Sequence, residues 1–177
     1  RNAMSGFYPY LVASLPMLQF GARPPFAFDR FLEMCRDMVP AQDLAHIQQC
    51  GDDAYLERDA AHPALAQWQA FEIGLRNELA KIRAGRRKAD AHTYLRHSAD
   101  ADQELYHVAL ASHRMTSLLE AERFLDRQRW DMLDRIAAGH FFDSTALILY
   151  ALKLRILLRW DRIARADTQA LLERILV

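Results

Sequence analysis

The chain has 177 residues, of which 51% are hydrophobic and 26% charged, and its 23 basic and 23 acidic residues give a formal net charge of zero. This composition excludes a disordered chain, which would carry less apolar surface and more net charge, and a general nucleic-acid-binding protein, which is normally clearly basic. Two cysteines, Cys35 and Cys50, are too few for a disulfide-stabilised scaffold.

The residue types favour helix throughout the chain. There are 28 Ala and 25 Leu against 4 Val, 8 Ile and 4 Thr, and β-branched residues lose more rotamer freedom in a helix. All six prolines lie at or before Pro63, so long helices can form beyond it. We predict an all-α fold in one compact unit, with short proline-punctuated elements over residues 4–62 and a bundle of longer helices over residues 63–177. Met4 is the expected native start.

The N-terminal elements are short. Residues 7–18 are aromatic and apolar, and so short a run fits either a helix or a strand. Residues 19–28 contain Gly and Pro and predict a loop. Helices are expected from about residue 29 to 38 and, after Pro40, to about residue 50.

After Pro63 the apolar residues recur at helical spacing. Trp68, Trp130 and Leu154 lie on such stripes, so they are expected to be core anchors. Thr116 or Ser117 can cap a helix, and residues 89–100 are a polar connection. The predicted helices cover about residues 63–84, 102–112, 117–139, 143–166 and 168–176.

The most apolar run, residues 146–158, is too short to span a bilayer and carries Lys153 and Arg155. We therefore expect a soluble, cytoplasmic protein with reduced thiols. A peripheral position at the cytoplasmic face of a membrane complex stays open.

Catalytic motifs are weak in this sequence. Glu104 and His107 are spaced i and i+3, as in half of a di-iron carboxylate site, but a second Glu-x-x-His is missing. A solvated or core-edge helix face is therefore the favoured explanation of the pair. There is also no nucleophile motif and no phosphate-binding glycine loop. We expect no catalytic residue, no metal and no cofactor.

A first basic cluster lies around the expected end of the helix that begins at Pro63. Cationic side chains at a helix C-terminus interact favourably with the helix dipole, and the same cluster could also bind an acidic protein. Its members are Lys81, Arg83, Arg86, Arg87 and Lys88.

A second basic group, Arg155, Arg159 and Arg162, forms a stripe at i, i+4 and i+7. If this helix packs antiparallel to the preceding helix, some of these arginines form ion pairs with acidic residues of that helix. Otherwise the stripe is a docking face for a partner. The acidic residues offered are Asp126, Asp131 and Asp134.

The residues from Gly139 to Asp143 form the most distinctive local motif. Gly139 is expected to end one helix and Asp143 to begin the next. Phe141 and Phe142 either anchor this corner to the core, with His140 as a buried imidazole bonded to a backbone carbonyl, or form an exposed aromatic contact.

The segment Tyr8-Pro-Tyr-Leu-Val-Ala-Ser-Leu-Pro16 resembles the opening of a bacterial family of unknown function, whose genes typically lie among those for V-type ATPase subunits. The likeness covers nearly the whole chain from Met4. The blocks that look like the family's C-terminal core are Leu125-Asp-Arg-Gln-Arg-Trp130, Gly139-His-Phe-Phe-Asp143, Tyr150-Ala-Leu-Lys-Leu154 and Arg159-Trp160.

The resemblance implies no catalytic residues, because no activity is established for the family. Its gene neighbourhood implies a non-catalytic subunit or assembly factor of a V-type ATPase. An all-α chain with a Tyr-rich opening is similar in general character to the helical central-stalk socket, which seats the shaft on the membrane rotor ring. We therefore expect central-stalk or rotor subunits as partners, and no nucleic acid. Two alternatives stay open: a stand-alone helical adaptor and a small helical metal-dependent enzyme using Glu104 and His107.

Overall fold

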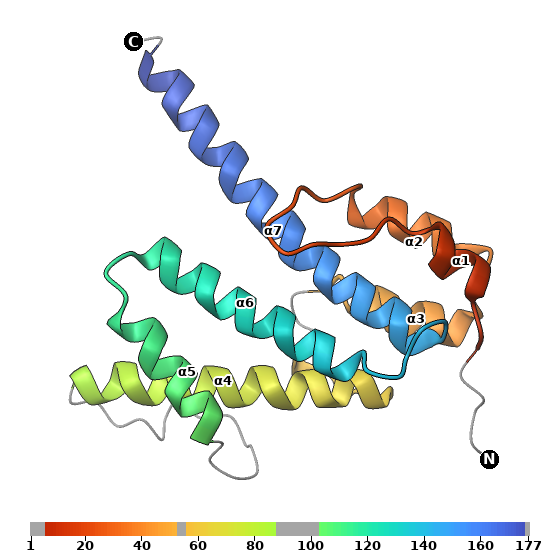
Figure 1. Ribbon diagram of the computed structural model, residues 1–177, viewed down its shortest axis with the longest axis horizontal. Coiled ribbons are helices and arrows are strands. Elements are labelled where there is room, and N and C mark those ends of the chain that lie inside the picture. The colour runs from red at the N-terminus through yellow and green to blue at the C-terminus, as the bar shows by residue number, and fades with distance from the viewer. Residues whose placement is uncertain (1–5, 53–55, 88–102, 176–177) are drawn as a thin grey trace. The chain divides into compact units, whose positions relative to one another are not determined.

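The computed structural model describes residues 6–52, 56–87 and 103–175. Across these ranges the chain forms seven helices and no strand, and the all-α prediction is confirmed (Figure 1). The backbone at Phe7 and Asp143 meets in an isolated antiparallel bridge. None of the helices in these ranges is long and apolar enough to cross a bilayer.

The chain divides into two compact units. Unit 1 comprises Arg1–Tyr55 and Ala137–Val177, and unit 2 comprises Leu56–Ile136. This division differs from the predicted boundary between residues 62 and 63, because the last helix belongs to the unit formed by the N-terminal elements.

Unit 1 contains α1 (Pro9–Ser14), α2 (Phe28–Arg36), α3 (Ala41–Gln49) and α7 (Ser144–Ile175). Helix α7 packs against α2 and α3, which also pack against each other. The ring of Phe31 on α2 lies 5.1 Å from that of Tyr150 on α7. The fully buried side chains of this unit include Leu11, Phe31, Ile47, Leu147, Ile148, Leu154 and Leu157.

The structure settles the choice left open for residues 7–18, because α1 is a helix with Pro9 in its first turn. Proline lacks a backbone N–H, and it is accepted there because the N–H groups of a helix's first turn have no intrahelical acceptor in any case. Helices α2 and α3 begin and end within two residues of the predicted bounds.

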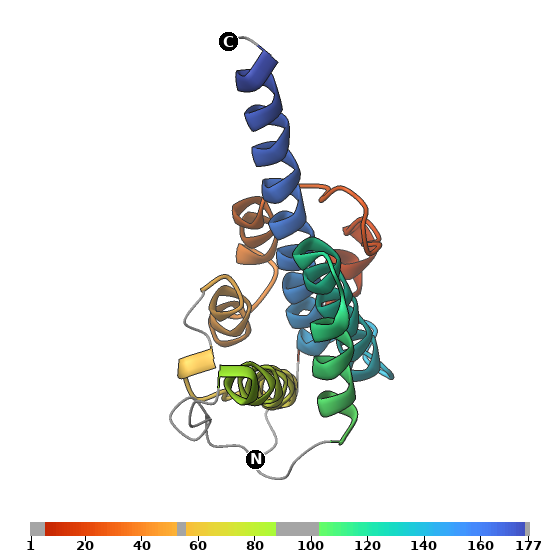
Figure 2. The ribbon, with the colours of Figure 1, turned by 90° about the vertical axis from the view of Figure 1, so that its left-hand side faces the viewer.

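Helix α7 is a single helix of 32 residues, about 48 Å long. The predicted break before residue 168 is wrong: the hydroxyl of Thr168 donates to the carbonyl oxygen of Ala164 at 2.9 Å, within a continuous helix. Figures 1 and 2 show the C-terminal turns of α7 continuing past α2 and α3 of the same unit.

Unit 2 contains α4 (Pro63–Arg87), α5 (Gln103–Arg114) and α6 (Leu118–Ile136), and each of these helices packs against the other two. Gly74 permits a close approach of α4 to α5, because a Cβ there would lie 2.7 Å from Cδ1 of Leu105. The hydroxyl of Ser117 accepts a hydrogen bond from the backbone N–H of Glu120, with N and Oγ 3.3 Å apart, so the predicted cap of α6 is confirmed. The predicted connection over residues 89–100 lies outside the described residues.

The three predicted core anchors are buried. Trp68 and Trp130 in unit 2 are 3% and 5% exposed, and Leu154 in unit 1 is fully buried. The rings of Trp68 and Phe71 stack at 5.6 Å on α4. At these three positions the apolar stripes identify the packed helix faces correctly.

Candidate interaction surfaces

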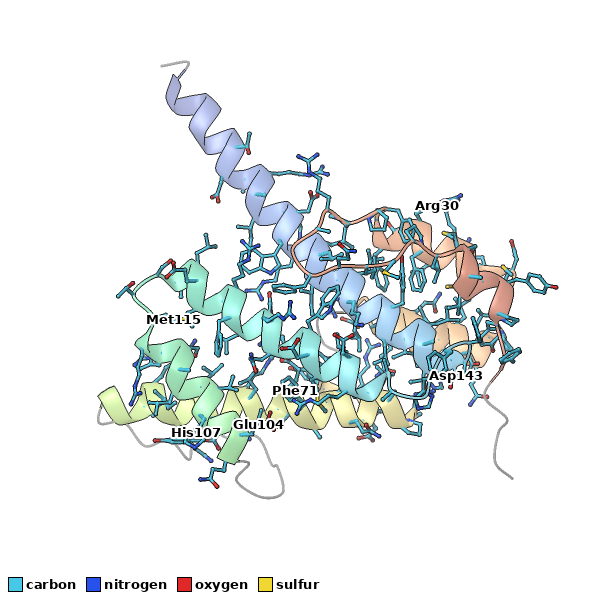
Figure 3. All side chains as sticks on the ribbon, in the orientation of Figure 1. Arg30, Phe71, Glu104, His107, Met115 and Asp143 are labelled. Carbon is cyan, nitrogen blue, oxygen red and sulfur yellow. The ribbon has the colours of Figure 1, made fainter. Side chains whose placement is uncertain are left out.

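The corner before α7 is built by backbone conformation and one carboxylate. Gly139 has φ +85°, a left-handed conformation that glycine adopts without steric penalty. Asp143 caps α7 by accepting the N–H of Ala146 at 3.0 Å through Oδ1. Its other oxygen, Oδ2, lies 2.5 Å from Nδ1 of His140. The predicted helix end and helix start are both confirmed here, and Figure 3 labels Asp143 at this position.

The aromatic residues of this corner are exposed, which overturns the interpretation that they anchor it to the core. Phe141 is 71% exposed and Phe142 is 39% exposed. His140 is also exposed and pairs with the Asp143 carboxylate rather than with a backbone carbonyl as a buried imidazole. The N–H of Tyr8 donates to the carbonyl oxygen of Phe142 at 2.5 Å.

The N-terminal segment adds further rings to the same corner. Phe7 lies edge-on to Phe142, with ring centroids 5.8 Å apart, and is 72% exposed. Tyr10, on α1, is 85% exposed. We call Phe7, Tyr10, Phe141 and Phe142 the aromatic corner. Sequence analysis identified Phe141 and Phe142 but missed Phe7 and Tyr10, because a bridge between residues so far apart in sequence leaves no local pattern.

Two tyrosines hold the N-terminal segment on unit 1. The hydroxyl of Tyr8 donates to Asp43 on α3 at 2.6 Å, and that of Tyr150 on α7 donates to the carbonyl oxygen of Pro16 at 3.0 Å. Burial and the neighbouring Asp43 carboxylate raise the pKa of Tyr8. Burial raises the pKa of Tyr150 to about 12. Both hydroxyls therefore stay protonated and can donate at neutral pH.

The basic stripe on α7 has two kinds of member. Arg155 is half-buried, and its Nη1 donates to the carbonyl oxygens of Cys50 at 2.6 Å and Asp52 at 3.2 Å. It therefore binds the C-terminal end of α3 and is no docking residue. The guanidinium of Arg159 lies 6.0 Å from the ring centroid of Trp160. Arg162 is exposed.

Two of the three acidic residues considered as partners for that stripe pair with arginines of α6 itself. Asp126 is buried and accepts from Arg129 at 2.8 Å, and Asp131 pairs with Arg127 at 3.1 Å. Helix spacing of i, i+3 or i, i+4 makes both pairs local.

The basic cluster at the end of α4 is partly paired. Nζ of Lys81 lies 2.7 Å from the carboxylate of Glu78, which is largely buried. Arg83 is exposed. The side chains of Arg86 and Arg87, and Lys88 as a whole, lie outside the described residues.

Glu104 and His107 lie near the start of α5 (Figure 3). The carboxylate of Glu104 is paired with Arg135 on α6 at 3.2 Å, and both side chains are exposed. The ring of His107 contacts Tyr106 edge-on, with centroids 5.6 Å apart. Within the part of the chain that the structure describes, no three His, Cys, Asp or Glu side chains are grouped as metal ligands would be.

A buried ion cluster between α4 and α6 was not predicted from the sequence. Arg129, 13% exposed, pairs through Nε with the carboxylate of Glu72 and through Nη1 with Asp126, both carboxylates being 2% exposed. A signal was present, because Glu72 follows Trp68 at i+4 and so falls on the buried face of α4. Its partner on α6, 57 residues away, has no such signal.

Comparison of this chain with family models, curated proteins and solved structures gave no match.

Proposed function

We propose that the protein is a non-catalytic subunit or assembly factor of a V-type ATPase. Its binding surface for a central-stalk or rotor subunit is the part of α7 around Arg162 and Arg165. The resemblance of the Tyr8–Pro16 segment and of the blocks on α6 and α7 to a family encoded among V-type ATPase genes supports the choice of partner. The exposure of α7 supports the choice of surface.

The observation that carries the proposal is the change in burial along α7. Leu154 and Leu157 are buried in unit 1, whereas residues 164–168 are exposed within the same continuous helix. Most helical stability in proteins comes from packing of an apolar face. A helical segment that lacks such packing within its own unit is suited to receive a partner.

Charge indicates the chemistry of that partner. Arg165 lies on this exposed part and pairs with Asp161 at 2.8 Å, and Arg162, three residues earlier, is also exposed. Such exposed pairs are worth only about 0–1 kcal/mol and exchange readily for pairs with another protein. We expect an acidic partner helix, with binding that weakens as salt rises because exposed charges are screened.

The test is capture of ATPase subunits by the tagged protein expressed at its natural level. Arg162→Glu with Arg165→Glu is expected to reduce capture about tenfold or more, because each reversal turns an attraction into a repulsion. The matched control is Arg30→Glu with Arg36→Glu on α2, which makes the same change in net charge at exposed positions of the same unit.

Three outcomes separate the alternatives. Loss of capture in the α7 pair and not in the α2 pair supports the proposed surface. Loss of capture in Arg83→Glu, and not in the α7 pair, would assign the contact to the end of α4. Absence of every ATPase subunit, while the complex itself is abundant in the cell, refutes the assignment and leaves the helical adaptor as the better account.

A further inference from the structure

The aromatic corner of unit 1 presents four large rings to solvent. Phe7, Tyr10 and Phe141 are each more than two thirds exposed, and Phe142 is 39% exposed. The corner is ordered, because the Tyr8 N–H bonds to Phe142 and the Tyr8 hydroxyl bonds to Asp43. The backbone that carries these rings is therefore fixed, so binding requires little further ordering of the backbone.

The corner also carries few charged groups. The two segments that build it, residues 6–22 and 137–152, contain no Lys, Arg or Glu, and their one carboxylate belongs to Asp143. That carboxylate is engaged by His140 and by the N–H of Ala146. An anionic membrane surface is recognised by clusters of Lys and Arg, so this surface is poorly suited to one.

We propose that the aromatic corner is the contact through which two copies of this chain associate. In a two-fold symmetric dimer each side chain near the axis meets its own copy, so any uncompensated charge there repels itself. A surface with few charged groups limits that repulsion. Aromatic rings attract each other in edge-to-face and offset geometries, as Phe7 and Phe142 already do within one chain.

The exposed area agrees with a weak dimer. Each aromatic side chain can bury about 150–250 Å², and at the exposed fractions found here the four rings offer about 500 Å² per chain. Two chains together then bury about 1,000 Å², the lower end for a specific interface. A dissociation constant in the micromolar range is expected for an interface of this size. This contact is separate from the proposed ATPase surface and does not rest on it.

Sedimentation velocity of the full chain over about 1–200 µM tests the proposal, since association follows mass action. The wild-type protein should shift from monomer to dimer across this range. Phe141→Glu should weaken dimerisation at least about tenfold, because two carboxylates then face each other at the axis. The control is Leu118→Glu on α6, which is 77% exposed and outside the corner.

A second measurement does not depend on the charge change. In Phe141→Cys, mild oxidation should link two chains through the new thiols, whereas Leu118→Cys should remain single; the native Cys35 and Cys50 are buried. Raising salt from about 0.1 to about 0.5 M should leave the dimer intact, unlike a contact between charged surfaces. A wild-type chain that stays monomeric at the highest concentration, or a dimer that Leu118→Glu disrupts and Phe141→Glu does not, would overturn the proposal.

Discussion

The buried ion cluster of unit 2 gives the sharpest test of how its helices are held. Arg129 on α6 bonds Glu72 on α4 and Asp126 on its own helix, and both carboxylates are 2% exposed. Arg129→Met removes the cation that both buried carboxylates share, while Arg76 on α4 stays 3.4 Å from the Glu72 carboxylate. Breaking a buried pair in this way costs about 3–5 kcal/mol, because the buried carboxylates lose a cation that compensates their desolvation.

This loss is measurable by urea unfolding followed by circular dichroism. With a slope of about 1.5 kcal/mol per molar urea, the midpoint for unit 2 should fall by about 2–3 M. Arg127→Met on the same helix is the control, because its pair with Asp131 is about half exposed. That pair is worth about 0–1 kcal/mol, so its midpoint should change by less than about 0.5 M.

A triple variant separates lost charge balance from lost packing. Glu72→Leu, Asp126→Leu and Arg129→Met together replace the cluster with apolar side chains, and such replacements are often neutral or stabilising. The triple variant should therefore recover most of the midpoint lost in Arg129→Met alone. The reasoning is refuted if Arg129→Met and Arg127→Met have the same small effect, or if the triple variant is no more stable than Arg129→Met.

Two further predictions concern the backbone and the thiols. Gly139→Ala should destabilise the protein by about 1–2 kcal/mol because φ is +85° there. Gly85→Ala, in α4 with open space around it, should stabilise the protein by about 0.5–1 kcal/mol. Thermal melts compare the two variants, and equal shifts in melting temperature would contradict the assigned backbone conformations. Burial raises the pKa of Cys35 and of Cys50 to about 12, so at about pH 8 neither carries thiolate and both should resist alkylation until urea unfolds the chain, as mass spectrometry of timed samples would show. Rapid labelling of the folded protein would mean that the thiols are accessible.

The sequence was sufficient to predict helix positions wherever a local signal marks a boundary. Pro63, Ser117 and Gly139 each act through their own backbone or side chain, and the structure has helix boundaries at or near all three. The false break before residue 168 falls in a polar run of the sequence. Polarity alone does not end a helix when Gly and Pro are absent, and Thr168 bonds back to the helix itself.

The candidate surfaces were harder to predict, because they depend on contacts between distant residues. Periodicity placed Arg155 on the same face as Arg162, but it contained no information on the carbonyl oxygens of Cys50 and Asp52 that Arg155 binds. The exposure of Phe141 depends equally on what packs nearby. A pattern within one helix identifies a face, and the fold then determines what that face meets.

Arg155 and Arg162, two of the three arginines of the α7 stripe, have different consequences for any functional test. Arg155→Glu would place a carboxylate against two carbonyl oxygens and remove two hydrogen bonds from a charged donor, each worth about 1.5–3 kcal/mol. It should therefore lower the unfolding midpoint of unit 1, whereas Arg162→Glu, at an exposed site, should change stability by less than about 0.5 kcal/mol.

A variant that changes Arg155 together with Arg162 could lose its partner because unit 1 is destabilised or because the docking surface is altered. Partner loss is assigned to the surface only when it occurs in Arg162→Glu with Arg165→Glu and the unfolding midpoint is unchanged. Comparing urea unfolding of Arg155→Glu with that of Arg162→Glu checks the distinction directly. An unfolding midpoint for Arg155→Glu equal to that of the wild type would show that its bonds to the end of α3 do not stabilise unit 1, and Arg155 would again become a candidate docking residue.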